Sequence, residues 1–256
     1  DALPIFGKNR ESCDLACANM VEDVIQTSTA GHPGAFIAET IQGNAGIVVP
    51  PKGYFQRVKE ILAAHGTLLV IDEVQTGFAR TGKMFAIEHF GVTPDIMAMA
   101  KALGNGAPIS AFISTAEIAD TYTRPGASTL GGNPVSTTAG LAVLDYIEKH
   151  DLCQNASERG EQLRAGLREI QKRHAIIGDI RGLGLMTGAE FVHTDKSPAA
   201  AELDDVLETL KDRGFIIGKN GVARNVMAFQ PPLVITAEDI DNVLNALEMV
   251  LTEKKL

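Results

Sequence analysis

The stretch from Thr67 to Lys101, TLLVIDEVQTGFARTGKMFAIEHFGVTPDIMAMAK, decides the fold of this chain. It contains two short apolar runs, at 68–71 and 96–100, and these runs end on Asp72 and Lys101. Short apolar runs with helix-like sequence between them are typical of strands that are covered on both faces of a parallel sheet. Ligands bind beyond the carboxyl ends of the strands in such sheets. The pattern therefore predicts that a carboxylate and an amine meet at one edge of the sheet.

A third apolar run, Gly34 to Ala38, ends on Glu39 and should bring a second carboxylate to the same edge. A strand can end on a charge simply because solvent begins there. Three such ends, each followed by a loop rich in Gly, Gln or Pro, favour a binding site. A lysine beside an acid suits pyridoxal phosphate, because the lysine holds the aldehyde as a Schiff base while the acid keeps the ring nitrogen protonated.

Two motifs of this region, LLVIDEVQTGFARTG at 68–82 and AKALGNGAPISAF at 100–112, resemble the signature of the class III (omega-amino acid) aminotransferases. The resemblance continues through ETIQGNAGIVVPPKGY, STLGGNPVSTTAGLAVL and IRGLGLMTGAEF, so it covers essentially the whole chain. The alanine–glyoxylate and 4-aminobutyrate group is the branch that it resembles. The family implies an α/β fold of type I, with a mostly parallel large domain and a smaller C-terminal α+β domain.

The resemblance implies a role for four residues at the cofactor. Lys101 would form the Schiff base and move the substrate proton, and Asp72 would pair with the ring nitrogen. Val74 would lie against one face of the pyridine ring, and Gln75 would lie at the ring hydroxyl. The mostly solvated character of lysines argues against any one of them being catalytic. Lys101 differs because it follows an apolar strand and precedes a Gly-rich loop that lets backbone approach a ligand, so we expect its amine to be partly desolvated.

The resemblance also implies contacts that reach beyond one set of strand ends. Ser128 and Thr129 would donate to the cofactor phosphate of a neighbouring subunit, which predicts a homodimer with shared active sites. Arg181, expected in a tight turn between glycines, would grip a substrate carboxylate, and Glu39 would neutralise Arg181 for substrates without that carboxylate. Arg80 could bind an anion by its charge, but arginines in loops are more often structural, and it is not among the predicted site residues.

The chain departs from the family pattern in several places. Thr40, Leu130 and Ala228 stand where relatives most often have Pro, an aromatic residue and Arg, respectively. The Gly-rich phosphate loop that the family carries upstream is not found, since Gly31 to Gly34 is typical of a turn. We therefore expect the sequence to be truncated at its N-terminus relative to the family.

The remaining sequence predicts two domains, at 1–149 and 150–256, because charged helices and short strands replace the parallel pattern after Lys149. Helices are expected at 11–27, 53–65, 135–149, 155–174, 199–213 and 237–253. Short strands are expected at 178–180, 185–191, 215–218 and 226–229. An Asn-Pro pair should cap the helix that begins near Val135.

Composition limits the classes of function. The chain has 256 residues, 45% of them hydrophobic, and a formal net charge of −9 with both signs interspersed, which argues against a nucleic-acid partner. No apolar run is long enough to span a membrane. Three cysteines without CxxC spacing and six scattered histidines support neither disulfides nor a metal site. A cytoplasmic location is expected, and the mitochondrial matrix is not excluded.

The sequence thus predicts an aminotransferase that moves an amino group between an amino acid, such as alanine, beta-alanine or 4-aminobutyrate, and a 2-oxo acid. Ping-pong kinetics are the expected signature. Three alternatives stay open: another class III reaction, such as an aminomutase or a decarboxylase; a non-catalytic fragment; and a Rossmann-type nucleotide-binding domain. The last is disfavoured because no GxGxxG or GxxxxGK[ST] motif follows a strand.

Overall fold

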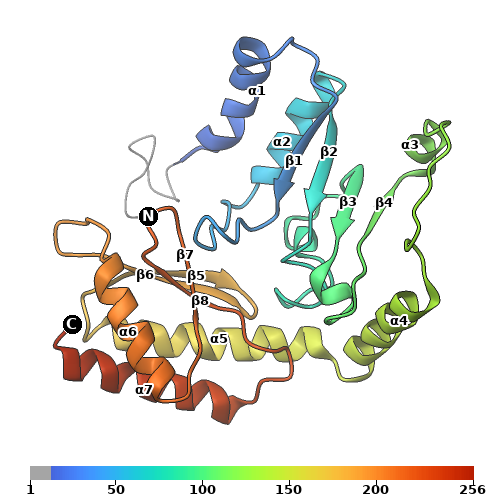
Figure 1. Ribbon diagram of the computed structural model, residues 1–256. Helices are drawn as coiled ribbons and strands as arrows, with labels where there is room; N and C mark the ends of the chain where they lie inside the picture. The colour runs from blue at the N-terminus through green and yellow to red at the C-terminus, as the bar shows by residue number, and fades with distance from the viewer. Residues whose placement is uncertain (1–12) are drawn as a thin grey trace.

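The computed structural model describes residues 13–256, which fold around two separate four-stranded sheets (Figure 1). The first sheet has the strand order β1-β2-β3-β4. Three of its strands run parallel: β1 (Ala35–Glu39), β2 (Leu68–Asp72) and β3 (Ile96–Met99). β4 (Ala111–Ser114) pairs antiparallel with β3, so the sheet is mixed.

The register of the parallel strands brings the predicted charges together. Glu39 lies opposite Asp72 in the β1–β2 pair, and Asp72 lies opposite Ala98 in the β2–β3 pair. Lys101 follows the end of β3 by two residues and begins the short 3-10 helix η2 (Lys101–Leu103). The prediction that the three strands deliver these charges to one edge is confirmed.

Two helices, α1 (Ala16–Ser28) and α2 (Tyr54–Ala64), pack on one face of this sheet (Figure 1). The inner face of α2 places Phe55, Val58, Ile61 and Leu62 against Leu69 and Ile71 of β2. On the other face, Ile37 of β1 is 67% exposed and Phe112 of β4 is 74% exposed. The expected cover on both faces is therefore wrong for residues 13–256: β2 and β3 alternate between buried and half-buried positions, and β4 is exposed at its first three residues.

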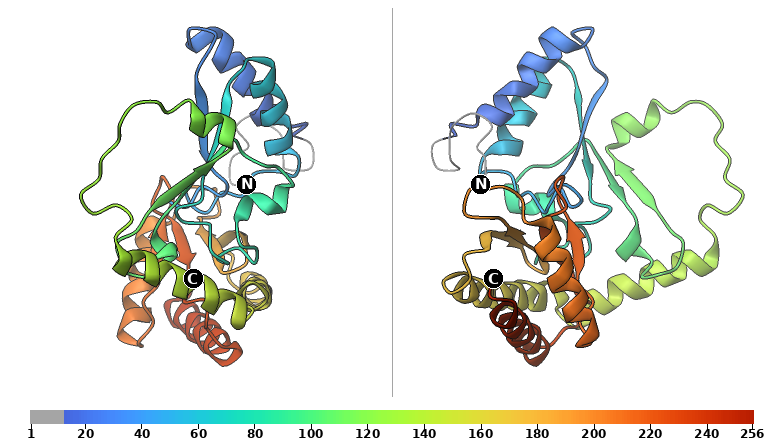
Figure 2. Two further views of the ribbon diagram at one scale, coloured as in Figure 1. Left: turned by 90° about the vertical axis from the view of Figure 1, so that its right-hand side faces the viewer. Right: turned by 60° about the vertical axis from the view of Figure 1, so that its left-hand side comes forward.

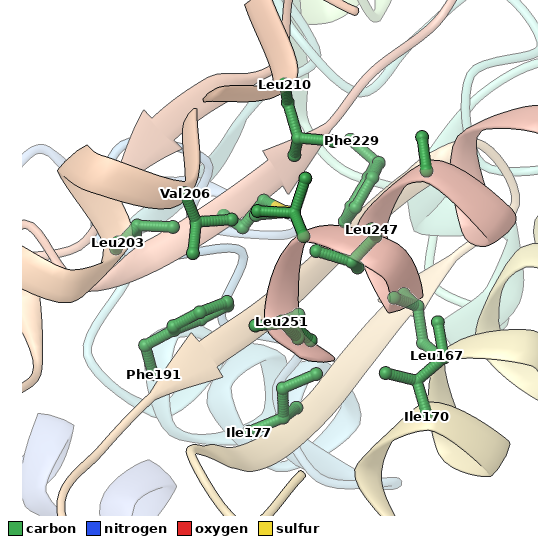
Figure 3. Packing of buried hydrophobic residues seen from close by; sticks show 14 of the residues in the cluster. Leu167, Ile170, Ile177, Phe191, Leu203, Val206, Leu210, Phe229, Leu247 and Leu251 are labelled. Atoms are coloured by element: carbon green, nitrogen blue, oxygen red, sulfur yellow. The ribbon is translucent and has the colours of Figure 1, made fainter. Parts of the chain in front are cut away.

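The second sheet is antiparallel throughout, with the order β5-β6-β8-β7. Its strands are β5 (Ile177–Leu183), β6 (Met186–Phe191), β7 (Gly218–Asn220) and β8 (Val226–Phe229). Three helices build a core on it: α5 (Leu152–Gln171), α6 (Ala200–Asp212) and α7 (Ala237–Lys254). In Figure 3, Leu251 lies between Phe191 and Leu167 in that core. This is the α+β unit that the sequence predicts.

A long connection joins the two sheets. It contains the short helix α3 (Ala116–Asp120), an extended segment at 121–133 that arcs away from the body, and α4 (Pro134–Lys149) (Figure 2). The Asn133 side chain accepts a hydrogen bond of 3.0 Å from Ser136 N, and Pro134 opens the helix, so the predicted Asn-Pro cap is confirmed. The predicted domain boundary near Lys149 falls at the end of α4.

Some elements differ from the sequence prediction. The strand expected at 215–218 is displaced, because β7 begins only at Gly218, while Phe215 and Ile217 pack against the core instead. α1 begins at Ala16, and the part of its predicted range at 11–12 lies outside the described residues. The sequence analysis assigned neither β4 nor the 3-10 helix η1 (Ala86–Phe90).

The two sheets are held together where three stretches of backbone touch. A Cβ on Gly160 of α5 would lie 1.9 Å from Gly184 O in the β5–β6 turn. A Cβ on Gly184 would lie 2.4 Å from the carbonyl carbon of Thr81, in the loop after β2. Gly184 also has a φ of 52°, a conformation that favours glycine. Only glycines allow α5 and this turn to lie directly against the loop that follows Asp72.

Candidate active site

Lys101 has a strained backbone. Its φ is 42°, in the left-handed region that lysine rarely adopts. The turn is closed by hydrogen bonds from Leu103 N to Ala100 O, at 3.0 Å, and from Gly104 N to Lys101 O, at 3.2 Å. A Cβ on Gly104 would lie 2.2 Å from Ala107 O, so the Gly-rich loop permits this tight fold. The Lys101 side chain is exposed, whereas the sequence analysis expected it to be partly desolvated.

The loop after β2 is shaped by its own acids. Asp72 is half-buried, and its Oδ1 accepts a hydrogen bond of 2.9 Å from Val74 N. Such a side-chain-to-backbone bond is typical of an Asx turn. The backbone of Glu73 donates to Ala98 O of β3 at 2.9 Å. These two bonds hold the end of β2 against the end of β3, which leads to Lys101.

Glu73 is fully buried, and its carboxylate accepts hydrogen bonds from three elements. The donors are the hydroxyl of Thr40, which follows β1, at 3.0 Å, the hydroxyl of Thr76, and the backbone amides of Ala86 and Ile87 at 3.1 and 2.8 Å. Burial raises the pKa of the Glu73 carboxyl, against the opposing effect of these four donors. The sequence analysis missed Glu73 because two adjacent acidic residues give no indication of which one is buried.

A cavity of about 610 Å³ opens beside Lys101. It is lined by three predicted site residues, Lys101, Val74 and Gln75, together with Arg80 and Gln230. Its volume is in the range of small-molecule sites. The structure therefore brings Lys101, Val74 and Gln75 together, while Asp72 lies two residues before Val74 and does not line the cavity.

A larger cavity of about 1170 Å³ lies beyond Gln75 and Gln230, against β8 and α7. Gln75 Nε2 donates to Gln230 Oε1 at 3.1 Å, and this pair belongs to the lining of both cavities. Most of the larger cavity is lined by the second sheet, by α7 and by the segments that precede β7 and α7, which contribute the exposed apolar residues Ile216 and Val234. We assign the site to the smaller cavity because only that one contains Lys101.

Arg80 joins the two sheets from within the smaller cavity. Its Nη1 donates to two backbone carbonyls, Leu185 O at 3.0 Å and Pro231 O at 2.6 Å. Burial lowers the pKa of the guanidinium to about 10, so it stays charged at neutral pH. Gln230, next to Pro231, has a buried Nε2 without a hydrogen-bond partner in the described chain.

Arg181 does not occupy the position that the sequence analysis gave it. It lies within strand β5 rather than in a turn, and its Nη1 pairs with Asp179 at 2.7 Å and with Glu190 at 2.6 Å. Its Nε donates to Gly46 O at 2.9 Å. Glu39 instead accepts from Gly43 N at 2.9 Å. The predicted ion pair between Glu39 and Arg181 is not formed, because each of the two groups has closer partners.

Ser128 and Thr129 lie in the extended segment at 121–133, and both are exposed. Ser128 Oγ accepts a hydrogen bond of 2.9 Å from Gly131 N, which shapes the turn before α4. Neither residue lines the cavity beside Lys101. Within one chain, the structure therefore does not bring them to the other predicted site residues.

We compared the sequence and the fold with those of known proteins. The sequence profile described as aminotransferase class-III matches residues 2–251. The Arabidopsis thaliana protein named alanine–glyoxylate aminotransferase 2 homolog 2, mitochondrial, is 43% identical over 252 residues, which are 97% of this chain and 52% of that protein. The leucine/methionine racemase of Thermococcus litoralis is 44% identical over 252 residues, with 97% of this chain and 56% of that protein covered. The chain thus spans about half the length of the curated relatives that it matches.

A solved structure shows the same fold. An aminotransferase from Bacillus anthracis superposes with a TM-score of 0.88 at 34% identity, covering 96% of this chain and 58% of that chain. The sheet, with a lysine and an acid at its carboxyl edge, is that of a fold type I pyridoxal-phosphate enzyme. More narrowly, the chain belongs to the class-III aminotransferase family.

Pyridoxal phosphate is the cofactor of this family, and the cavity residues fit it. An exposed lysine amine, which can hold an aldehyde, lies beside Val74 and Gln75. The Gln230 side chain keeps one unused donor next to the same cavity. Two cations and no acid line the cavity, which matches an anionic ligand.

Glu73 generates a prediction about pH. A carboxyl whose pKa is raised by folding contributes stability that is complete below its ordinary value of 4.5 and is lost as the pH rises through the folded value. The free energy of unfolding of the wild type, minus that of Glu73→Gln, should therefore fall as the pH rises above about 4.5. Urea unfolding across a pH series measures this difference. A flat curve for Glu73→Gln would contradict the burial effect.

Proposed function

We propose that the protein transfers an amino group between an amino acid and a 2-oxo acid, with pyridoxal phosphate held at Lys101. The observation that supports this most strongly is the left-handed backbone of Lys101 at the mouth of a cavity shared with Val74 and Gln75. A residue that is held in a costly conformation beside a cavity is commonly functional. Family membership supports the same reaction.

The roles of the residues follow from their chemistry. Pyridoxal phosphate, when bound, supplies an aldehyde that takes up the amino group and a ring that accepts the electron pair left by the lost proton. Lys101 Nζ holds the cofactor and, once freed, carries the substrate proton. The Asp72 carboxylate, two residues before Val74 at the end of β2, would keep the ring nitrogen protonated. Val74 excludes water from one face of the ring, and the Gln75 amide is a hydrogen-bond donor for the ring hydroxyl.

Lys101 is tested by chemical trapping. Borohydride reduction of the cofactor-loaded protein should leave a pyridoxyl group on the peptide that contains Lys101. The Lys101→Ala variant should not form this adduct, and its turnover should be at least about a hundredfold lower. Lys83→Ala is the matched control, since Lys83 is an exposed lysine of the neighbouring loop. Mass spectrometry of the peptides reads out the adduct independently of activity. An adduct on another lysine would refute the assignment.

The same preparation separates the alternative reactions. With L-alanine and 2-oxoglutarate, transamination yields pyruvate and glutamate in equal amounts. The Thermococcus litoralis relative is named as a racemase, so the appearance of D-alanine without the oxo acid would favour that reaction here. Carbon dioxide or an isomeric amino acid would indicate a decarboxylase or an aminomutase, and a protein without any adduct would be a non-catalytic fragment.

Asp72 is tested by removing its charge alone. Asp72→Asn keeps an oxygen that can accept from Val74 N, so the turn should survive. Loss of the charge opposite a buried pyridinium costs roughly 3 kcal/mol if the pair is desolvated, which lowers turnover at least about a hundredfold. Steady-state kinetics together with a thermal melt would measure both effects. Turnover near that of the wild type would remove Asp72 from the mechanism.

We further propose a homodimer in which Ser128 and Thr129 serve the partner's cofactor phosphate. Their exposure, on a segment that leaves the body of the chain, supports this (Figure 2). If the sites are shared, Lys101→Ala and Thr129→Ala subunits should complement each other. Random assortment gives hybrid dimers with one intact site, so co-expression should restore about a quarter of the wild-type activity. No recovery in dimers verified by light scattering would show that each site belongs to one chain.

We place the protein in a reducing compartment, the cytoplasm, with the mitochondrial matrix as the alternative. The three cysteines, Cys13, Cys17 and Cys153, are all free thiols. None of the helices formed by residues 13–256 combines the length and apolar character that crossing a membrane requires. Fractionation of the source cells would distinguish the two compartments.

A further inference from the structure

Arg80 is a desolvated cation whose charge no acidic side chain of the described chain balances. Two other buried arginines each pair with a carboxylate, Arg164 with Glu161 at 3.1 Å and Arg181 with Asp179 and Glu190. Arg80 has only carbonyl partners, and desolvation alone shifts its pKa. A buried charge without a counter-ion is costly, so such a group is commonly matched by a ligand.

The hydrogen bonds of Arg80 leave one particular edge of the guanidinium open. Both hydrogen bonds of the guanidinium, to Leu185 O and Pro231 O, start from Nη1. Nε and Nη2 make no hydrogen bond in the described residues, and neither is among the fully buried unpaired nitrogens, which are Arg159 Nε and Gln230 Nε2. Neither atom is therefore completely buried. Together they form the edge that binds a planar carboxylate with two parallel hydrogen bonds.

The surroundings of this edge are cationic. Arg80 and Lys101 are the two charged residues that line the smaller cavity, and neither Asp nor Glu lines it. Gln230 contributes a further donor, because its Nε2 has no hydrogen-bond partner in the described chain. The next residue, Pro231, accepts the hydrogen bond from Arg80 Nη1. An ammonium group would offer these donors no acceptor. An anionic group, placed between Arg80 and the reacting amine at Lys101, would satisfy them.

We propose that Arg80 binds the carboxylate of the amino-acid and oxo-acid substrates in this cavity. This inference rests on the proposed function and replaces Arg181, whose charge is already matched, as the carboxylate receptor. The open edge can hold a carboxylate or a phosphate with two hydrogen bonds, and the lining of the cavity favours the carboxylate. Phosphates are usually held by several backbone amides at a helix N-terminus, and of the helices in the described chain only the three-residue 3-10 helix η2 begins at this cavity.

The first test measures binding without turnover. Calorimetry of the cofactor-loaded protein with glutarate, which has carboxylates but no amino group, gives a dissociation constant that does not depend on catalysis. Arg80→Gln should raise that constant about ten- to a hundredfold, and Arg80→Lys should recover part of the loss because the charge returns without the planar pair. Arg224→Gln is the matched control, since Arg224 also donates only to a backbone carbonyl and should bind glutarate as the wild type does.

The second test compares two substrates that differ in the carboxylate. L-Alanine and isopropylamine share the reacting carbon, but isopropylamine has a methyl group in place of the carboxylate. Arg80→Gln should raise KM for alanine about ten- to a hundredfold and leave the half-reaction with isopropylamine within about twofold of the wild type. Equal losses for both amines, with a lowered melting temperature, would show that Arg80 only holds the loops at Leu185 and Pro231 and would overturn the proposal.

A third measurement separates the two sources of an anion. If Arg80→Gln weakened the retention of pyridoxal phosphate but not that of pyridoxal, Arg80 would serve the cofactor phosphate and the proposal would be wrong. Failure of the proposed function looks different. Without an adduct on Lys101 the aminotransferase assignment fails, yet glutarate binding that depends on Arg80 would still stand as a property of the cavity.

Discussion

The buried carboxylate of Glu73 is the constraint on which the site depends. It binds donors after β1, in the loop after β2 and at the start of η1, so three segments far apart in sequence share one acceptor. Burial raises its pKa, which means that the ionised group is unfavourable in energy even while it fixes the geometry. Asp72 and Val74, the neighbours of Glu73 on either side, therefore hold their positions relative to β3 and Lys101.

The second constraint is the close packing of backbones between the two sheets. Gly160 and Gly184 bring α5 and the β5–β6 turn against the loop after Asp72, and Arg80 binds carbonyls of the second sheet across the same junction. The cavity beside Lys101 is built from both units, since Gln230 belongs to the second. A rotation of one unit against the other would change the cavity and break the Arg80 contacts together. Such a motion is therefore coupled to the site by geometry.

The edge of the sheet could be predicted because it depends on local pattern. Apolar runs that end on Glu39, Asp72 and Lys101 define parallel strands, and parallel register then fixes which ends meet. The Asn133 cap could likewise be predicted, because it depends on the adjacent residues Asn133 and Pro134. Arg80 and Gln230 could not be found in this way, because their importance arises from contacts across more than a hundred residues. The partners of Arg181 were missed for a similar reason, since cross-strand register pairs it with Gly188 and so brings Glu190 within reach.

The left-handed backbone of Lys101 also has a consequence for how this sequence can change with time. The conformation costs on the order of 1 kcal/mol for any residue with a Cβ, and glycine would adopt it without strain. Selection for stability alone would thus replace the lysine. Only the chemical function of its amine favours keeping it. In a duplicated copy that had lost the chemistry, position 101 should be among the first to become glycine or asparagine, while Glu73 would persist because the fold still requires it.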